Sequence, residues 1–537
     1  MTEATQTDAK DRKNSFVIVY HRQPYEEVTE GGKTIYRENK SPNGVVPALK
    51  GFFSTAKDAC WVAWKQSPAP GKAMFQRRIH IEDSYGSYDV VRLPLTAEQV
   101  KSFYHVTSKE AFWPILHSFP WLFNYDAVDW DTFCEVNRLF AEAACEQATD
   151  DAFIWVHDYN LWLVPHYVRR MKPNARIAFF HHTPFPAPDV FNVVPWRKEI
   201  LDSLLKCDIV GFHIPRYAEN FASLACSLAG AKRLTRRDVE GPFNPTGAAL
   251  SEPEVTTELT IDGRRVEIDA WPIGTNPEVI NKHLSTFEAG GRVADIKNQI
   301  GERRLLLSVG RVDYTKGTKQ MLEAFDRLLA RRPELRGKVQ LFCVAVAAAD
   351  GMTVYRAAQR EIERLVGAIN GRYGNLSWTP ILLSTRPVPF DELLCYYSAA
   401  DVCWITPLRD GLNLVAKEFV AAQNGEPGAL ILSEFTGASV EFPEAVSTNP
   451  YSAASMDAAI DVALDMSREE RESRMESMRR RVNRWDVNHW AHHVQERFAG
   501  LGAKRDSNGG KVAPLKTDKS GTDKKPAGKP GDAPRAA

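Results

Sequence analysis

Short stretches in which nearly every residue is apolar recur along the chain, each followed by a loop and a helical segment. A strand with one solvated face alternates apolar and polar residues, whereas a strand covered on both faces is apolar throughout. The pattern therefore predicts an α/β chain with two doubly wound parallel sheets. The predicted strands are FVIVYH from residue 16, FIWVHDY from 153, RIAFFHH from 176, DIVGFH from 208, RLLLSVGRVD from 304, VQLFCVAV from 339, DVCWITP from 401 and GALILSEF from 428.

Proline and glycine interrupt the pattern at AWPIGTNPEVI, residues 270–280, and a new Rossmann-like unit follows. We predict an N-terminal Rossmann-like domain over 15–272 and a C-terminal one over 273–480. A helix over 481–500 is expected to pack back on the N-terminal domain. Residues 1–14 are polar and predicted flexible, and 501–537, rich in Lys, Gly, Pro and Asp without an aromatic residue, predict a disordered tail.

Charge and composition narrow the range of partners. The 537 residues carry 68 basic and 68 acidic side chains, so no overall field attracts nucleic acid or a membrane surface. No apolar stretch approaches the length of a membrane span, and the polar N-terminus lacks the apolar core of a secretory signal. We expect a cytosolic protein whose eight scattered cysteines are reduced core residues.

The predicted strands end in reactive side chains. In open parallel sheets, ligands bind beyond the carboxyl ends of the strands. Five such ends carry His, Asp, Arg or Lys, which predicts a binding cleft between two domains. These residues are Tyr20, His21 and Arg22; His157 and Asp158; His181 and His182; Arg311, Asp313 and Lys316; and Arg409, Asp410 and Gly411.

Two of these ends are candidate anion sites. Arg311 and Lys316 precede a helix, where a guanidinium, an ammonium and free backbone N–H groups together suit a diphosphate. A solvated basic loop is the alternative. Asp410 and Gly411 form a turn before another helix, and Glu418 on that helix can accept hydrogen bonds from a ribose. The alternative for Glu418 is a buried structural acid paired with Arg or Lys.

Three further segments remain ambiguous from their residues alone. Asn43 and Gly44 precede an apolar helix and can seat a phosphate, but the polar segment before them also fits a surface hairpin. Tyr104 and Trp113 fit a core or a site. The histidines fit catalytic or merely hydrogen-bonded roles, and their spacing is not that of a metal site.

Taken together, HDYNL, HTPFP, GRVDYTKG, INGRYG and PLRDGLNLVAKEFVAAQ resemble the family of trehalose-6-phosphate synthases and glucosylglycerol-phosphate synthases. The resemblance runs from about residue 16 to 500 and implies a retaining glycosyltransferase with two facing Rossmann-like domains, the GT-B fold, and an interdomain active-site cleft. It also implies a nucleotide sugar as co-substrate, with no tightly bound cofactor and no metal. The N-terminal domain would bind the acceptor, and the C-terminal domain would bind the nucleotide sugar.

The resemblance also implies a role for each candidate residue. Arg311 and Lys316 would hold the donor diphosphate, His182 would lie beside the transferred glucose, and Asp158 on the acceptor side. The donor-binding residues would be Asn43, Gly44, Asp410, Gly411, Leu412, Asn413, Leu414 and Glu418, and those around the acceptor phosphate Arg22, Tyr104 and Trp113.

Two departures from the trehalose-6-phosphate pattern point to the other branch of the family. SPNGVV stands where a Gly-Gly pair is expected, and Gln359 stands where an arginine helps to bind glucose-6-phosphate. We expect glucose transfer from ADP-glucose to glycerol-3-phosphate, giving 2-O-glucosylglycerol phosphate, an osmolyte precursor. The alternatives are UDP-glucose with glucose-6-phosphate, and a catalytically silent sugar-phosphate sensor. The expected partners are small-molecule substrates, without nucleic acid or membrane, and homo-oligomerisation is left open.

Overall fold

The computed structural model describes residues 13–38, 44–54, 58–69, 73–239, 244–245, 247–347 and 353–507. The chain divides into two compact units, residues 1–494 and 495–537, and every strand belongs to the first unit. The helix α17 (Val487–Ser507) begins in the first unit and ends in the second. Because α17 reaches Ser507, the predicted disordered tail does not begin at residue 501, and the remainder of that segment lies outside the described residues.

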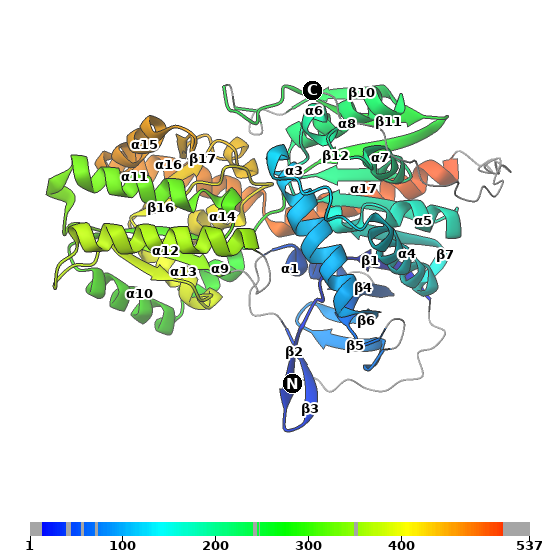
Figure 1. Ribbon diagram of the computed structural model, residues 1–537, viewed down its shortest axis with the longest axis horizontal. Helices are drawn as coiled ribbons and strands as arrows, with labels where there is room; N and C mark the ends of the chain where they lie inside the picture. Colours follow the sequence, from blue (N-terminus) through cyan, green and yellow to red (C-terminus); the bar gives the residue numbers. More distant parts are fainter. Residues whose placement is uncertain are drawn as a thin grey trace, which may run out of the picture. The chain divides into compact units, whose positions relative to one another are not determined.

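The N-terminal sheet has ten strands, in the order β10-β11-β12-β9-β8-β7-β1-β4-β6-β5 (Figure 1). Its strands from β12 to β6 are parallel, and antiparallel strands flank them at both edges. The strands are β1 (Asn14–Val19), β4 (Ala59–Gln66), β5 (Arg78–Asp83), β6 (Gly86–Leu95), β7 (Ala148–His157), β8 (Arg176–His181), β9 (Ile209–Phe212), β10 (Lys232–Asp238), β11 (Glu254–Ile261) and β12 (Arg264–Ala270).

Helices accompany this sheet between the strands. The longest of them, α4, is amphipathic and buries Phe133, Val136 and Phe140 in the same apolar core as the strands. The helices are α1 (Val45–Lys50), α2 (Ala97–Val100), α3 (Trp113–Leu116), α4 (Trp130–Gln147), α5 (Val164–Met171), α6 (Pro188–Phe191), α7 (Arg197–Leu204) and α8 (Pro215–Ala229), with short 3-10 turns η1 (Gly51–Ser54), η3 (Pro120–Leu122) and η4 (Tyr159–Leu161) and a π-helix, η2 (Lys101–Phe112).

The C-terminal sheet has six parallel strands in the order β15-β14-β13-β16-β17-β18. Counted within the sheet this is the order 3-2-1-4-5-6 of a Rossmann fold. The strands are β13 (Arg304–Arg311), β14 (Val339–Val346), β15 (Ile381–Ser384), β16 (Val402–Ile405), β17 (Ala429–Ser433) and β18 (Val446–Thr448).

Both faces of this sheet are covered, as an apolar strand requires. On β13, Leu306 packs into a core with α11, α12 and α15, while Leu305 and Leu307 pack into another with α10, α13, α14 and α16. The helices are α9 (Pro277–Leu284), α10 (Phe287–Ile300), α11 (Thr318–Arg331), α12 (Thr353–Tyr373), α13 (Phe390–Ala399), α14 (Leu414–Ala422), α15 (Ala453–Asp465) and α16 (Arg468–Arg484), with 3-10 turns η6 (Tyr314–Lys316), η7 (Pro333–Leu335) and η8 (Gly437–Val440).

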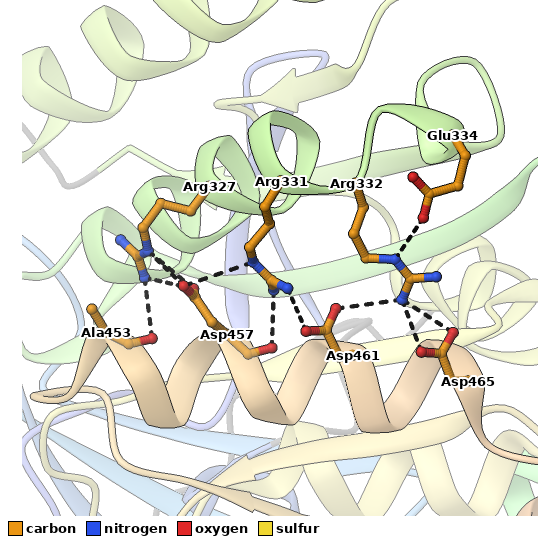
Figure 2. Close-up of polar contacts among 8 residues, drawn as sticks. All are labelled: Arg327, Arg331, Arg332, Glu334, Ala453, Asp457, Asp461 and Asp465. Carbon is orange, nitrogen blue, oxygen red and sulfur yellow. Dashed lines mark hydrogen bonds and ion pairs between the residues drawn. The ribbon is translucent and has the colours of Figure 1, made fainter.

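A row of ion pairs joins α11 to α15 across the surface of this sheet's helical layer (Figure 2). Arg327 Nε lies 3.0 Å from Asp457 Oδ1, Arg331 pairs with Asp461, and Arg332 Nη1 lies 2.9 Å from Asp465 Oδ2. The acids recur every four residues, so one face of α15 presents them in line to the arginines.

All eight predicted strands are present, and the predicted fold class is confirmed. The sequence between β1 and α1 contains a hairpin, β2 (Glu26–Glu30) and β3 (Lys33–Arg37), so the hairpin alternative is right for this segment. Its turn residues Gly31 and Gly32 have φ of 58° and 78°, as a tight hairpin turn requires. None of the described helices combines the length and hydrophobicity that a membrane span requires.

The segment predicted as a domain boundary links the two sheets. β12 ends at Ala270, and α9 begins at Pro277 with Asn276 as its N-cap. The chain returns beside this link, because the Val487 N–H donates to the Thr275 carbonyl at 2.9 Å. A Cβ at Gly274 would lie 2.1 Å from the Asp486 carbonyl carbon, so only glycine fits between the two passages. The exact domain limits stay a prediction.

Candidate active site

The reactive strand ends form two groups, each on neighbouring strands. β1, β7 and β8 are adjacent in the N-terminal sheet, so Arg22, Asp158 and His182 follow strands at the same edge. β13 and β16 are adjacent in the C-terminal sheet, which brings Lys316 and Asp410 together. Sequence reasoning placed all five at strand ends, and the sheet order explains why they gather.

The two groups meet at the turn that follows β16. A Cβ on Gly411 would lie 2.6 Å from the His182 carbonyl oxygen, so the two backbones are in direct contact. The Tyr217 hydroxyl donates to the Asp410 carbonyl oxygen at 3.0 Å, which fastens the same turn to α8. The candidate site therefore includes residues from both sheets.

His182 is an uncharged group with a free ring nitrogen. Its Nε2 lies 3.1 Å from Nδ1 of the buried His157, so one ring donates to the other. Burial, and then the nearby imidazoles of His157 and His213, hold the pKa of His182 well below its usual range. Its Nδ1 has no hydrogen-bond partner among the described residues. A neutral imidazole with one unsatisfied nitrogen is suited to bind a sugar hydroxyl.

Asp158 follows β7 in a strained conformation, with a φ of 69° that few residues other than glycine adopt. Its Oδ1 accepts from the Tyr159 N–H at 3.0 Å and from the Thr183 hydroxyl at 3.3 Å. Burial raises the pKa of Asp158 to about 6, although these hydrogen bonds act in the opposite direction. The carboxyl group can therefore change charge near neutral pH.

Lys316 and Asp410 form an ion pair at the heart of the C-terminal group, with Nζ 2.7 Å from Oδ2. Burial opposes the charge on Asp410, but the nearby Lys316 and hydrogen bonds from Lys316 and Asn413 outweigh it and hold the pKa of Asp410 below its usual value. Arg311 is exposed and makes no ion pair within the described parts of the chain. An anion arriving here meets one unpaired guanidinium and one ammonium that Asp410 already orients.

The helix α14 begins beside this pair. Asn413, its N-cap, has a φ of 88° and accepts from the Ala416 N–H at 3.0 Å. The first N–H groups of a helix lack partners within it, so this end attracts negative charge. Leu412 is buried and Leu414 is half-buried, so both help to form the apolar wall of the helix start.

Glu418 lies one helical turn further and is 2% exposed. The Tyr397 hydroxyl donates to its Oε2 at 3.3 Å, and burial raises the pKa of Glu418 to about 8. No cation pairs with it among the described residues, whereas the adjacent Lys417 pairs with Glu441 at 2.8 Å. The alternative of a structural acid paired with Arg or Lys is therefore wrong for Glu418.

Gly44 and Leu414 line one cavity of about 650 Å³. Gly44 is the N-cap of α1, with a φ of 107°, and Phe390 and Leu394 of α13 form part of the opposite wall. This cavity is large enough for a nucleoside, and Leu414 connects it to the start of α14. Asn43 lies outside the described residues, so its predicted position stays a prediction.

The predicted acceptor residues come from three elements. Arg22 is exposed after β1, and Tyr104 is half-buried on η2. Trp113 is 7% exposed and packs in the core, yet its Nε1 has no hydrogen-bond partner among the described residues. Gln359 lies on α12 and donates to Glu363 at 2.9 Å. None of these contacts tests the predicted acceptor role.

Two residues near this group escaped sequence reasoning. Lys109 lies between Tyr104 and Trp113 on η2, and Tyr355 on α12 is 5% exposed and close enough to Tyr104 and Arg311 to be influenced by their charges. Neither residue follows a predicted strand, so the search for reactive side chains at the carboxyl ends of strands did not find them. Within the described ranges, no three His, Cys, Asp or Glu residues form a group that could hold a metal ion.

Comparisons with known proteins identify the family and the fold. The model of glycosyltransferase family 20 matches residues 14–499. The glucosylglycerol-phosphate synthase of Synechocystis sp. is 57% identical over 91% of this chain and 98% of that protein. The trehalose-6-phosphate synthase of a Mycobacterium species is 37% identical over 89% of this chain and 95% of that protein. The crystal structure of the UDP-forming trehalose-phosphate synthase of Burkholderia vietnamiensis has a TM-score of 0.79 at 28% identity, covering 92% of this chain and 98% of that one.

Proposed function

Because the chain belongs to glycosyltransferase family 20, we propose that it transfers glucose from ADP-glucose to glycerol-3-phosphate with retention of configuration. The product would be 2-O-glucosylglycerol phosphate, the precursor of a compatible solute. The protein is a glycosyltransferase with the GT-B fold. The identity of its two substrates and the roles of its site residues are proposed.

The main support for this proposal is the difference between two sequence identities, each measured over nearly the whole chain. Identity to a glucosylglycerol-phosphate synthase is 57%, and identity to a trehalose-6-phosphate synthase is 37%. Gln359 supports the same branch, because it removes a cation expected for a hexose-phosphate acceptor. ADP-glucose is proposed as the donor because of this branch of the family. Side chains do not distinguish adenine from uracil here, since nucleobases are often bound by backbone groups.

In the proposed reaction, the bond between the glucose C1 and the diphosphate oxygen breaks while the acceptor hydroxyl oxygen bonds to C1 on the same face. The leaving phosphate takes the proton of that hydroxyl. Arg311 and Lys316 would stabilise the charge that grows on the diphosphate, an effect of several kcal/mol in comparable sites. The neutral His182 would bind a glucose hydroxyl, and Glu418 the ribose.

Two observations support the donor roles. Asp410 already holds Lys316 in place, so little ordering of the ammonium remains when a diphosphate binds. Glu418 is buried and pairs with no cation of the described residues, and two ribose hydroxyls would supply the hydrogen bonds that its carboxyl group lacks.

A two-by-two turnover assay tests the proposal. The purified protein is given ADP-glucose or UDP-glucose with glycerol-3-phosphate or glucose-6-phosphate, and nucleoside diphosphate release and product mass are recorded. We expect turnover with ADP-glucose and glycerol-3-phosphate. Turnover only with UDP-glucose and glucose-6-phosphate would identify a trehalose-6-phosphate synthase, and a folded protein without turnover in any combination would favour the sensor.

A further inference from the structure

Within the described parts of the chain, Lys109 is a buried lysine without a carboxylate partner. Three lysines are buried among the described residues, and two of them form ion pairs: Lys50 with Asp83 at 2.6 Å and Lys417 with Glu441 at 2.8 Å. Lys109, 7% exposed, has neither an ion pair nor a hydrogen bond with any described side chain. A buried charge without a partner is costly, so this position needs another explanation.

Two aromatic rings, those of Trp113 and Tyr104, lie beside the Lys109 ammonium. Its Nζ lies 4.2 Å from the ring centroid of Trp113 and 5.6 Å from that of Tyr104. Such cation–π contacts stabilise an ammonium but leave its positive charge available to an anion. The ring contacts therefore position the charge at the acceptor side of the site.

The π-helical geometry of η2 brings these side chains together. In a π-helix each N–H bonds to the carbonyl five residues earlier, as the Trp113 N–H does with Ser108. Tyr104 and Lys109 are five residues apart, so they share a face that an ordinary α-helix would not give them. Irregular helical turns of this kind are frequently found at functional sites.

Other cations surround Lys109, and the nearby acids are already occupied. Burial lowers the pKa of Lys109, the neighbouring Tyr104 acts in the opposite direction, and the charges of Arg311 and Arg22 lower the pKa further. The nearby Asp313 accepts from the Thr315 N–H and hydroxyl, both at 2.9 Å, and Asp158 accepts from Tyr159 and Thr183. Among the described residues, these three cations form no ion pair with a carboxylate, so together they form a site for an anion with more than one negative charge.

We propose that Lys109 binds the phosphate of the acceptor, together with Arg22, and supplies from η2 the positive charge that Gln359 does not supply from α12. This inference rests on the proposed function, because it assumes a phosphorylated acceptor. A phosphate held from η2 rather than α12 lies at a different distance from the reacting hydroxyl. Lys109 is then a residue that helps to set which acceptor phosphate fits.

The test compares Lys109→Met, which removes the charge, with Lys109→Arg, which keeps it. Lys198→Met is the matched control, because Lys198 is 65% exposed and pairs only with Asp202 on its own helix. A hydrogen bond to a charged group contributes enough for Lys109→Met to raise the KM for glycerol-3-phosphate about 10- to 100-fold. The KM for ADP-glucose should change less than about twofold, and Lys109→Arg should keep most of the acceptor affinity.

Two outcomes would overturn the inference: a folded Lys109→Met with an unchanged acceptor KM, or an equal rise in both KM values, which indicates a structural role. Should wild-type protein use only glucose-6-phosphate, the proposed function fails, and the same comparison with glucose-6-phosphate still decides the role of Lys109. Lys109→Gln replaces Lys109→Met should the latter melt below the assay temperature.

A second measurement needs no turnover. Inorganic phosphate is titrated into each variant, and the melting temperature is recorded. We expect phosphate to raise the melting temperature of wild type, Lys109→Arg and Lys198→Met, and to raise that of Lys109→Met at most half as much. An equal rise in Lys109→Met and wild type would contradict phosphate binding by Lys109 even in a protein that is inactive.

Discussion

At the scale of single residues, Lys316 shows how one ammonium can serve structure and chemistry. It pairs with Asp410 at 2.7 Å and lies near the exposed Arg311 at the carboxyl end of β13. In the proposed reaction the charge of Lys316 is needed most when the diphosphate leaves. Its removal should therefore affect the transition state more than the fold.

We predict that Lys316→Ala lowers kcat by about two to three orders of magnitude, the effect of losing one charge-stabilising donor. The melting temperature should fall, because the substitution leaves the buried Asp410 carboxylate without its ion-pair partner, but the protein should still fold. Lys319→Ala is the control, since Lys319 is 51% exposed on α11, the helix that follows η6. Near-normal turnover in a folded Lys316→Ala protein would refute the assigned role.

Glu418 gives a prediction about stability and pH. Burial raises its pKa from 4.5 to about 8, so between these values the folded protein binds more protons here than the unfolded chain does. Stability then falls as pH rises through this window. Glu418→Gln cannot ionise and lacks this loss, so its melting temperature relative to wild type should rise between about pH 5 and pH 9.

The control for that experiment is Glu26→Gln, at an exposed position of the β2–β3 hairpin, measured over the same pH range. Melting curves by circular dichroism provide the measurement. The KM of Glu418→Gln for the nucleotide sugar should also rise, because an amide accepts fewer hydrogen bonds from a ribose than a carboxylate does. A constant difference in melting temperature across the pH range would show that Glu418 ionises normally.

At the scale of elements, the row of ion pairs between α11 and α15 is the clearest case of side chains fastening two helices (Figure 2). Asp461 contacts both Arg331 and Arg332, so one acid connects neighbouring arginines. These groups are about one quarter to one third exposed, and solvent screening limits what each pair contributes.

We predict that Asp461→Asn lowers the free energy of unfolding by about 0.5–1 kcal/mol in low salt and by less in about 0.5 M salt, where the charges are screened. Denaturant unfolding at the two salt concentrations measures the difference. Asp126→Asn, at an exposed position, is the control. A loss that does not depend on salt would indicate packing rather than charge as the cause.

Elements also show where a sequence pattern stops being informative. β13, β14, β16 and β17 are apolar on both faces and are readily recognised. β10 is exposed at every residue, so its place at the sheet edge has no apolar signature. The π-helix η2 lacks one as well, since it has more residues per turn than an α-helix and does not give the α-helical pattern, and Lys109 was missed for this reason.

At the scale of the whole molecule, the contact between Gly411 and His182 joins the two sheets at the site. A Cβ at Gly411 would lie 2.6 Å from a backbone oxygen, too close to be accommodated without movement. We predict that Gly411→Ala lowers kcat at least about tenfold, because a displacement near 1 Å is enough to misalign reacting groups. Turnover and melting temperature should be measured together.

Gly425→Ala is the matched control, because nothing lies within 4 Å of a Cβ built there. It should keep wild-type turnover. Equal turnover in Gly411→Ala and wild type would mean that the turn and His182 separate without consequence for the reaction.

The sequence by itself determined the α/β class, the buried strands and the reactive groups at their ends. These features depend on the local order of residues along the chain. A strand buried on both faces must be apolar, and a ligand-binding side chain follows directly after it. Only the tertiary structure decided which of those ends meet, that Lys316 pairs with Asp410 while Glu418 pairs with no cation of the described residues, and that Lys109 lies buried beside Trp113. The Lys316–Asp410 pair and the surroundings of Glu418 depend on distances between residues far apart in the chain, and the position of Lys109 depends on the π-helical geometry of η2; the apolar pattern of the sequence encodes neither.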